Sequence, residues 1–136
     1  PEGGDLTLEN AKGPKTLAVL IVDDEPEVAE LIAEILQLDG HETLIRNNGQ
    51  RALDAVGLTD FDVILSDLRM PDYDGPWLLG ALRDKHPELV DRIAFVTGDT
   101  LSSDIASFLK ESGRPHIEKP ITPKEVRNLV TLLTQA

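Results

Sequence analysis

Short apolar runs alternate along the chain with segments whose apolar residues recur at helical spacing. The first run, 17–22, is bounded by turn-forming residues, which is typical of a strand buried on both faces. The pattern predicts further strands at 43–45, 63–65, 93–97 and 116–118. Apolar residues at helical spacing predict helices within 26–40, 49–56, 77–82, 105–109 and 122–133. Five strands therefore alternate with five helices.

This alternation predicts an α/β fold with a doubly wound, five-stranded parallel sheet. Buried strands joined by helical crossovers pair in parallel and carry helices on both faces of the sheet. The common open arrangement of five such units has the strand order 2-1-3-4-5, and its ligands bind beyond the carboxyl ends of the strands. With 136 residues the chain is too short for a closed eight-unit barrel. Residues 1–16, which show no period, are expected to form a tail or linker, and 17–136 the domain.

Composition and charge exclude several classes of function. Hydrophobic residues make up 40% of the chain, which is ordinary for one globular domain. The longest apolar run, 17–22, is far shorter than the ~20 residues of a membrane span, so no membrane contact is expected. The absence of cysteine excludes disulfides and thiolate metal sites, and it fits a cytoplasmic location. The formal net charge of -12 disfavours direct binding of nucleic acid.

Polar residues follow four of the five predicted strands at the edge where ligands are expected. They are Asp23, Asp24 and Glu25 after the first strand, Asp67 after the third, Thr97 after the fourth and Lys119 after the fifth. Each has a simple structural explanation alone, because acids before a helix cap its N-terminus and a lysine is usually solvated. Their arrival at one edge from four separate segments favours a common site instead.

The residue types at this edge suit phosphoryl chemistry with a divalent cation. Magnesium is usually held by one or two carboxylates together with water and a substrate phosphate. Carboxylates that lie close together repel one another unless a cation is present. A carboxylate such as Asp67 can attack phosphorus and form an aspartyl phosphate, while the Lys119 ammonium and the Thr97 hydroxyl neutralise the phosphoryl oxygens.

The motifs, taken in this order, resemble the response-regulator receiver family of two-component phosphorelays. The resemblance covers the chain from about Leu17 to the C-terminus. It rests on four segments: 22–26 with its acidic pair, 66–71 with Gly75 further on, 96–98, and 118–120. It implies a flavodoxin-like fold and a magnesium-dependent transfer of a phosphoryl group from a phospho-histidine to Asp67.

The resemblance also implies a role for each residue around Asp67. Asp24 and Asp67 would bind Mg²⁺ (or Mn²⁺) directly, Asp23 would bind it through water, and the backbone carbonyl of Arg69 would complete the protein's share. Lys119 would pair with Asp67 and then with a phosphoryl oxygen. The bond from Lys119 to the following proline would be cis, which an X-Pro bond permits at modest cost.

Thr97 and His116 are the residues expected to report the phosphorylation. The Thr97 hydroxyl would move to the phosphoryl group and alter the face formed by the fourth helix, fifth strand and fifth helix, through which a weak homodimer could also form. His116 stands where the family usually carries Tyr or Phe, so either a reduced rotamer switch or a plain structural role is expected. Arg69 and Asp99 could form an ion pair across the mouth of the site, or remain two solvated charges.

The expected partner is a histidine kinase or a histidine phosphotransfer domain. The segment itself is expected to be a self-modifying phosphoacceptor rather than a turnover enzyme, and whether its parent chain is a kinase stays open. Residues 3–10 resemble the closing region of a histidine-kinase ATP-binding domain, and the chain begins with Pro1, so a hybrid sensor kinase is the favoured parent. A stand-alone regulator and a degenerate receiver used only as an interaction platform are the alternatives.

Two other phosphate-handling classes fit the sequence less well. Phosphatases and mutases of the haloacid-dehalogenase type carry a second acid two residues after the nucleophile, where this chain has Arg69. Flavodoxin-like mononucleotide carriers cradle phosphate with Ser, Thr and Gly in the first loop, whereas the acids at 23–25 would repel it.

Overall fold

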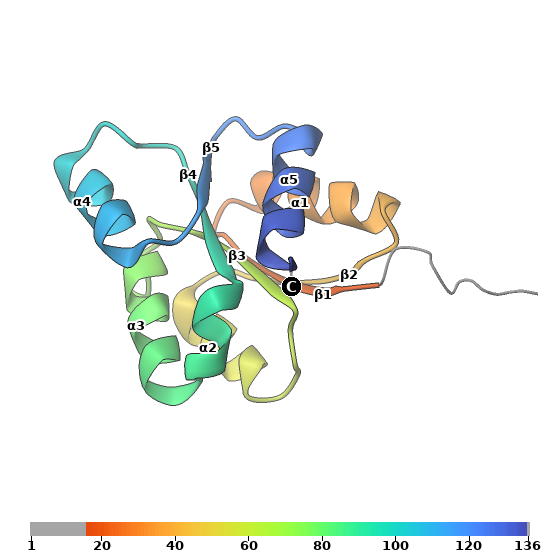
Figure 1. The fold of residues 1–136 in the computed structure, drawn as a ribbon, viewed down its shortest axis with the longest axis horizontal. Helices are drawn as coiled ribbons and strands as arrows, with labels where there is room; N and C mark the ends of the chain where they lie inside the picture. The colour runs from red at the N-terminus through yellow and green to blue at the C-terminus, as the bar shows by residue number, and fades with distance from the viewer. Residues whose placement is uncertain (1–15, 136) are drawn as a thin grey trace, which may run out of the picture.

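A computed structural model of the chain describes residues 16–135. Its centre is a five-stranded parallel sheet with the order β2-β1-β3-β4-β5 (Figure 1). The strands are β1 (Ala18–Val22), β2 (Glu42–Arg46), β3 (Val63–Asp67), β4 (Ile93–Thr97) and β5 (His116–Glu118). The predicted fold class and strand order are confirmed. The predicted tail lies outside the described residues, except for Thr16.

Helices follow each strand, as the apolar spacing predicted. They are α1 (Pro26–Leu38), α2 (Gly49–Val56), α3 (Gly75–Lys85), α4 (Ser103–Ser112) and α5 (Pro123–Leu133). Side-chain oxygens of Asn48, Asp74 and Thr122 accept N–H groups of the first turns of α2, α3 and α5, which satisfies donors that have no partner within the helix. None of the helices within residues 16–135 has the length and apolar character that a membrane crossing requires.

The sequence pattern missed one element, the 3-10 helix η1 (Pro87–Arg92). Its six residues bury only Leu89, so they carry no apolar period that could be recognised. Pro87 at its start supplies a fixed φ, and the element connects α3 to β4.

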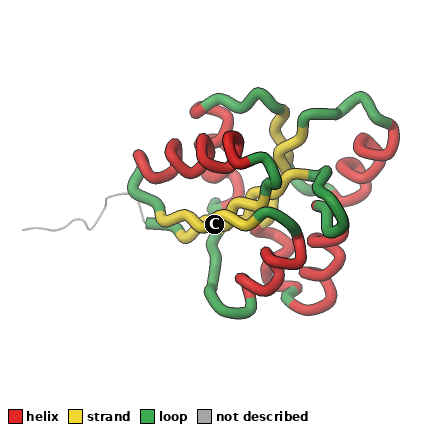
Figure 2. Tube along the Cα trace, turned by 180° about the vertical axis from the view of Figure 1, so that it is seen from behind, coloured by secondary structure: helices red, strands yellow, loops and turns green. Residues whose placement is uncertain are grey.

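The sheet lies between two layers of helices (Figure 2). Side chains of one face, such as Val19 and Leu65, pack with the buried residues of α1 and α5. Those of the other face, such as Leu20 and Phe95, pack with α2, α3 and α4. Every residue of β3 and β4 is buried, which explains why these strands appear as continuous apolar runs rather than alternating ones. The rigid centre of the sheet therefore presents the ends of β1, β3 and β4 to the site.

Helix α4 is the least buried of the five helices. Only Ile105 and Leu109 are buried in it, while Phe108 is partly buried and packs edge-to-face on Phe95 with ring centroids 5.3 Å apart. Figure 1 shows α4 at the periphery of the molecule. A cavity of about 440 Å³ lies between it and β5, lined by Leu109, His116 and neighbouring residues. The helix ends at Gly113, whose φ of 68° lies in the left-handed region that favours glycine.

Candidate functional site

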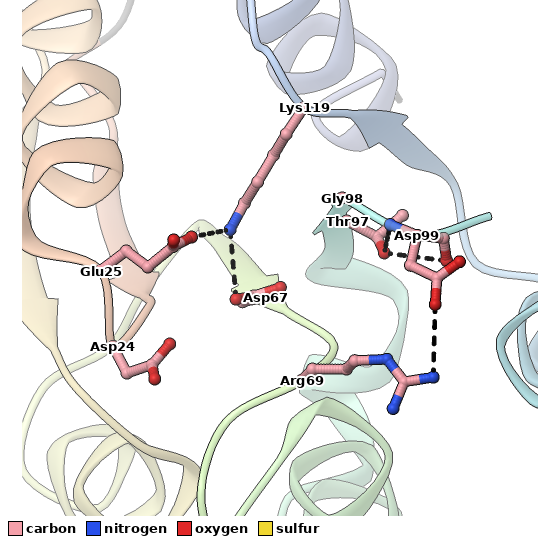
Figure 3. A pocket seen from close by; sticks show the side chains of 8 residues that line it. All are labelled: Asp24, Glu25, Asp67, Arg69, Thr97, Gly98, Asp99 and Lys119. Carbon is pink, nitrogen blue, oxygen red and sulfur yellow. Dashed lines mark hydrogen bonds and ion pairs between the residues drawn. The ribbon is translucent and has the colours of Figure 1, made fainter. Parts of the chain in front are cut away.

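A pocket of about 430 Å³ opens at the carboxyl ends of the strands (Figure 3). Its lining is almost entirely polar or charged: Asp24, Glu25, Asp67, Arg69, Thr97, Gly98, Asp99 and Lys119. These residues come from the segments after β1, β3, β4 and β5, which are far apart in the sequence. The structure thus brings together most of the residues that the sequence placed at this edge.

Asp67, the last residue of β3, lies buried at the centre of the site with 6% of its surface exposed. Its Oδ1 accepts the N–H of Leu68 at 2.8 Å, and the backbone N–H of Arg69 also donates to the carboxylate. Burial raises the pKa of the Asp67 carboxyl above its ordinary value, although the Lys119 ammonium and these N–H groups oppose the rise. The outcome is a desolvated carboxylate that is held in one orientation.

The backbone around Asp67 is fixed by a close approach from the start of α3. A Cβ on Gly75 would lie 2.7 Å from the Asp67 carbonyl oxygen and 3.0 Å from Cα of Leu68. Only glycine leaves room for this contact, so the chain can turn back from the end of β3 and return directly against it. Gly75 also donates its N–H to the Leu68 carbonyl at 3.1 Å, which ties the two segments together.

Asp23 is the second buried acid, with 3% of its surface exposed. Its Oδ1 accepts the N–H of Glu25 at 2.9 Å. Its Oδ2 is buried without a hydrogen bond and lies 3.3 Å from Nζ of Lys119, an ionic contact only. Burial raises the pKa of Asp23 to about 6, and the nearby Asp67 charge adds to the rise, while the Glu25 N–H and Lys119 oppose it. An orphaned buried carboxylate oxygen is well suited to a cation.

Lys119 is the only cation that contacts this acidic cluster within residues 16–135. Its Nζ lies 2.6 Å from Oε1 of Glu25, 3.2 Å from Oδ2 of Asp67 and 3.3 Å from Oδ2 of Asp23. Burial lowers the pKa of the ammonium, but the hydrogen bond to Glu25 and the charges of Asp67 and Asp23 outweigh burial and raise the pKa above its ordinary value. The Lys119–Pro120 bond is cis, as the resemblance implied.

Carboxylate oxygens of Asp23, Glu25 and Asp67 lie within 4.8 Å of one another. A set made only of carboxylate oxygens, one of them without a hydrogen bond, fits a hard divalent cation such as Mg²⁺. Asp24, expected from the resemblance to bind the metal directly, lines the pocket but is exposed and lies outside this cluster. Glu25, which belongs to the cluster, was placed at this edge by the sequence, but no role of its own was predicted for it. The available signal was its place directly after the acidic pair, at the end of β1.

Thr97 and Arg69 lie on the other side of the pocket. Thr97 is buried, and its Oγ1 accepts the N–H of Asp99 at 3.1 Å. Nη2 of Arg69 lies 3.5 Å from Oδ2 of Asp99 and 3.3 Å from Oγ of Ser102, so of the two alternatives the structure shows the ion pair, between side chains that are both exposed (Figure 3). The pair links the loop after β3 to the loop after β4. His116 is not part of this pocket, because it lies exposed on β5 beside the cavity under α4.

Comparison with known proteins identifies the family. Residues 19–131 match the family described as "Response regulator receiver domain". The chain belongs to the response-regulator receiver family. Among its relatives, a response regulator receiver protein of Anaeromyxobacter sp. (strain Fw109-5) is 34% identical over 110 residues, which cover 81% of this chain and 45% of that protein. The receiver domain thus spans less than half the length of this relative.

Solved structures of receiver domains share the fold. The signal receiver domain of a signal transduction histidine kinase from Syntrophus aciditrophicus superposes with a TM-score of 0.75 at 28% identity, covering 89% of this chain and 95% of that one. The receiver domain of sensor histidine kinase PA1611 from Pseudomonas aeruginosa PAO1 gives a TM-score of 0.79 at 21% identity, covering 89% and 100%. That receiver domain has a magnesium ion coordinated in its active site cleft.

The two buried acids of this receiver domain should destabilise it at neutral pH when no divalent cation is bound. The pKa of Asp23 rises from 3.8 to about 6 on folding, so the stability linked to this group is present below pH 3.8 and is lost as the pH rises through 6. We expect Asp23→Asn to raise the free energy of unfolding by about 2 kcal/mol at pH 7 in EDTA. The gain should vanish near pH 4. Urea unfolding at both pH values measures it.

The matched control is Asp84→Asn, which removes the charge of an exposed acid on α3. It should change the stability by less than about 0.5 kcal/mol at either pH. A loss of stability in Asp23→Asn at pH 7, or a difference that is the same at both pH values, would contradict the expectation.

Proposed function

We propose that this receiver domain accepts a phosphoryl group on Asp67 from a phospho-histidine, with a divalent cation bound beside it. The observation that carries the proposal is the surroundings of Asp67. Its buried carboxylate lies 3.2 Å from the Lys119 ammonium and within one oxygen cluster with Asp23 and Glu25. These contacts support a nucleophile with a countercharge and a cation beside it at the end of β3.

The transfer requires only one bond to form and one to break. An oxygen of the Asp67 carboxylate forms a bond to phosphorus, and the phosphorus–nitrogen bond of the phospho-histidine breaks. The other ring nitrogen of the donor carries a proton, and the electron pair of the broken bond stays on the imidazole nitrogen, so a neutral histidine leaves. Lys119, freed from its contact with the Asp67 oxygen, pairs with an oxygen of the new phosphoryl group. The buried position of Asp67 limits the access of water to the product.

Mg²⁺ is the proposed cofactor, and Mn²⁺ is expected to replace it. Asp23 and Asp67 are buried within the oxygen cluster and would hold the ion. Asp24, on the pocket wall, and the backbone carbonyl of Arg69 are the further ligands that the family resemblance implies. When bound, the ion would neutralise the charge that gathers on the phosphoryl oxygens.

The proposed readout runs from Thr97 to the face formed by α4, β5 and α5. Thr97 ends β4 inside the pocket, and the loop that follows it leads to α4. Movement of its hydroxyl to the phosphoryl group would break the bond that it now accepts from the Asp99 N–H. His116 on β5 borders the cavity under α4, where a displaced loop or helix would change its surroundings. A weak homodimer through this face belongs to the same proposal.

The phosphodonor is proposed to be a histidine kinase or a histidine phosphotransfer domain. The parent protein has two candidates. The likeness to the receiver of a Syntrophus histidine kinase supports a hybrid kinase, whereas the Anaeromyxobacter response regulator supports a separate regulator. Residues 3–10, on which the hybrid prediction rests in part, lie outside the described residues. The sequence encoded upstream of Pro1 distinguishes the two.

The test is incubation with a small phosphodonor, phosphoramidate, followed by intact-mass measurement. With Mg²⁺ we expect the mass of one phosphoryl group to be added, and we expect at least a tenfold slower addition when EDTA replaces the ion, because the acidic cluster then repels the anion. If neither phosphoramidate nor a phosphorylated histidine kinase adds mass in the presence of Mg²⁺, the proposal is wrong. The degenerate receiver that acts only as an interaction platform would then be the better description.

A further inference from the structure

Glu25 makes the shortest contact in the site, although its residue type and position predicted no role there. It precedes the first residue of α1, and its side chain does not cap that helix. Oε1 instead accepts a hydrogen bond from Nζ of Lys119 at 2.6 Å, 94 positions away in the chain. Figure 3 shows the Lys119 side chain reaching down between Glu25 and Asp67. The Glu25 side chain is 57% exposed, so it lies at the rim of the pocket, above the two buried acids.

Lys119 contacts three acids, so the group that it forms with them is negative. Asp23, Glu25 and Asp67 carry three negative charges against one positive charge of Lys119, a net charge of -2. Asp24, on the pocket wall, adds a further negative charge outside these contacts. Without Glu25 the net charge would be -1, and an ammonium and a divalent cation would compete for the two remaining carboxylates. Arg69 does not change this balance, because its charge is paired with Asp99.

We propose that Glu25 is a positioning residue that holds the Lys119 ammonium at the rim while a divalent cation occupies the oxygens of Asp23 and Asp67. The inference rests on the proposed function in one respect, that the site binds Mg²⁺. Burial fixes the carboxylates of Asp23 and Asp67 in place, with 3% and 6% of their surfaces exposed. Glu25 is free to follow the ammonium, because its exposed side chain has no other hydrogen-bond partner among the described residues.

The physical reason is the repulsion between two cations in one small site. Nζ of Lys119 lies 3.2 Å and 3.3 Å from the same carboxylates that an ion would need. An ion bound to these oxygens would displace the ammonium from them, and Glu25 would supply the partner that remains. Lys119 would then stay at the rim of the pocket, within reach of the proposed phosphoryl group. Glu25 thereby couples cation binding to the position of Lys119.

A double-mutant cycle on Mg²⁺ affinity tests this coupling. The titration follows the amide signal of Leu68, whose N–H donates to Asp67, in the wild type, Glu25→Gln, Lys119→Gln and the double variant. Glu25→Gln should weaken Mg²⁺ binding about tenfold in the wild-type background, because the negative charge of Glu25 and its ionic contact with Lys119 are both lost. In the Lys119→Gln background only the charge is lost, and the effect should fall to about two- to threefold.

A second variant shortens the side chain at position 25 and keeps its charge, without altering Lys119. Glu25→Asp keeps the charge but is one methylene shorter, so it cannot keep the 2.6 Å contact at the present backbone position. We expect it to weaken Mg²⁺ binding about threefold or more. Glu27→Gln, which removes an exposed acid from the first turn of α1, is the matched control for charge alone and should change the affinity by less than about twofold.

Each outcome decides between the alternatives. If Glu25→Gln lowers the Mg²⁺ affinity equally in both backgrounds, Glu25 is a metal ligand or a remote charge, and the positioning role is wrong. Wild-type Mg²⁺ affinity in Glu25→Asp would also overturn that role. If Mg²⁺ shifts no amide signal in the wild type, the proposed function itself fails. The titration uses the metal alone and no phosphodonor, so the two failures are distinguishable.

Discussion

Asp67→Asn is expected to abolish the addition of a phosphoryl group, reducing its rate by at least about 100-fold. The amide oxygen of asparagine is a far weaker nucleophile than a carboxylate, whereas its shape preserves the contact with the Leu68 N–H. Among the pocket acids, only Asp67 combines burial at the end of a central strand with a Lys119 contact at 3.2 Å. Intact-mass measurement with phosphoramidate and Mg²⁺, followed by peptide mapping, checks the result.

Asp99→Asn is the matched control for this experiment. Asp99 lines the same pocket and carries the same charge, but it contacts Arg69 instead of Lys119. The variant should still gain one phosphoryl group at Asp67, at a rate within about tenfold of that of the wild type. If Asp67→Asn still gains a phosphoryl group, the phosphoacceptor is another residue. If both variants fail to gain one, the effect is not specific to Asp67.

Gly75→Ala is expected to have the largest effect on stability, lowering the free energy of unfolding by about 3 kcal/mol. The added Cβ would lie 2.7 Å from the Asp67 carbonyl oxygen and 3.0 Å from Cα of Leu68, both of which are backbone atoms that cannot rotate away. A third neighbour, the ring of Phe95, is 3.1 Å away and fully buried. The chain must therefore shift around Asp67. Urea unfolding measures the loss.

Gly80→Ala provides the matched control within the same helix. Gly80 is exposed on α3, and a Cβ there meets no atom within 4 Å. Alanine is a better helix former than glycine, so this variant should gain about 1 kcal/mol. A loss of less than about 0.5 kcal/mol in Gly75→Ala would show that the start of α3 moves without cost, contrary to the packing described.

The strands and the edge at which the site lies were predictable from spacing, and the strand order from the arrangement that five such units commonly adopt. The runs at 63–65 and 93–97 are continuous and apolar, so both strands had to be central, and whatever followed them had to meet at one edge. Thr122 illustrates the same point for a helix, since a threonine followed three positions later by a glutamate has the spacing of a capping box, and its Oγ1 accepts the Glu125 N–H. Because parallel strands end at one edge of the sheet, local patterns at their ends together predict a site.

The role of Glu25 could not be predicted in this way. Whether an acid at the end of β1 reaches Lys119 depends on side-chain conformation, and neighbouring positions 24 and 25 look alike in sequence. The structure separates them, because Glu25 joins the oxygen cluster and Asp24 does not. The position of His116 relative to the pocket could not be predicted either. Its place on β5 was predicted, but its separation from the pocket depends on how α4 sits against the sheet.

The shallow attachment of α4 has a thermodynamic consequence for the whole domain. Its two buried side chains, Ile105 and Leu109, contribute about 1.5–3 kcal/mol each to holding it on the sheet. β3 and β4, in contrast, are buried throughout, so they separate only in global unfolding. We therefore expect α4 to detach from the sheet at a lower free energy than that of global unfolding. If Asp67 is phosphorylated as proposed, the change at the site would need to shift only this helix, while the buried strands beneath it keep their geometry.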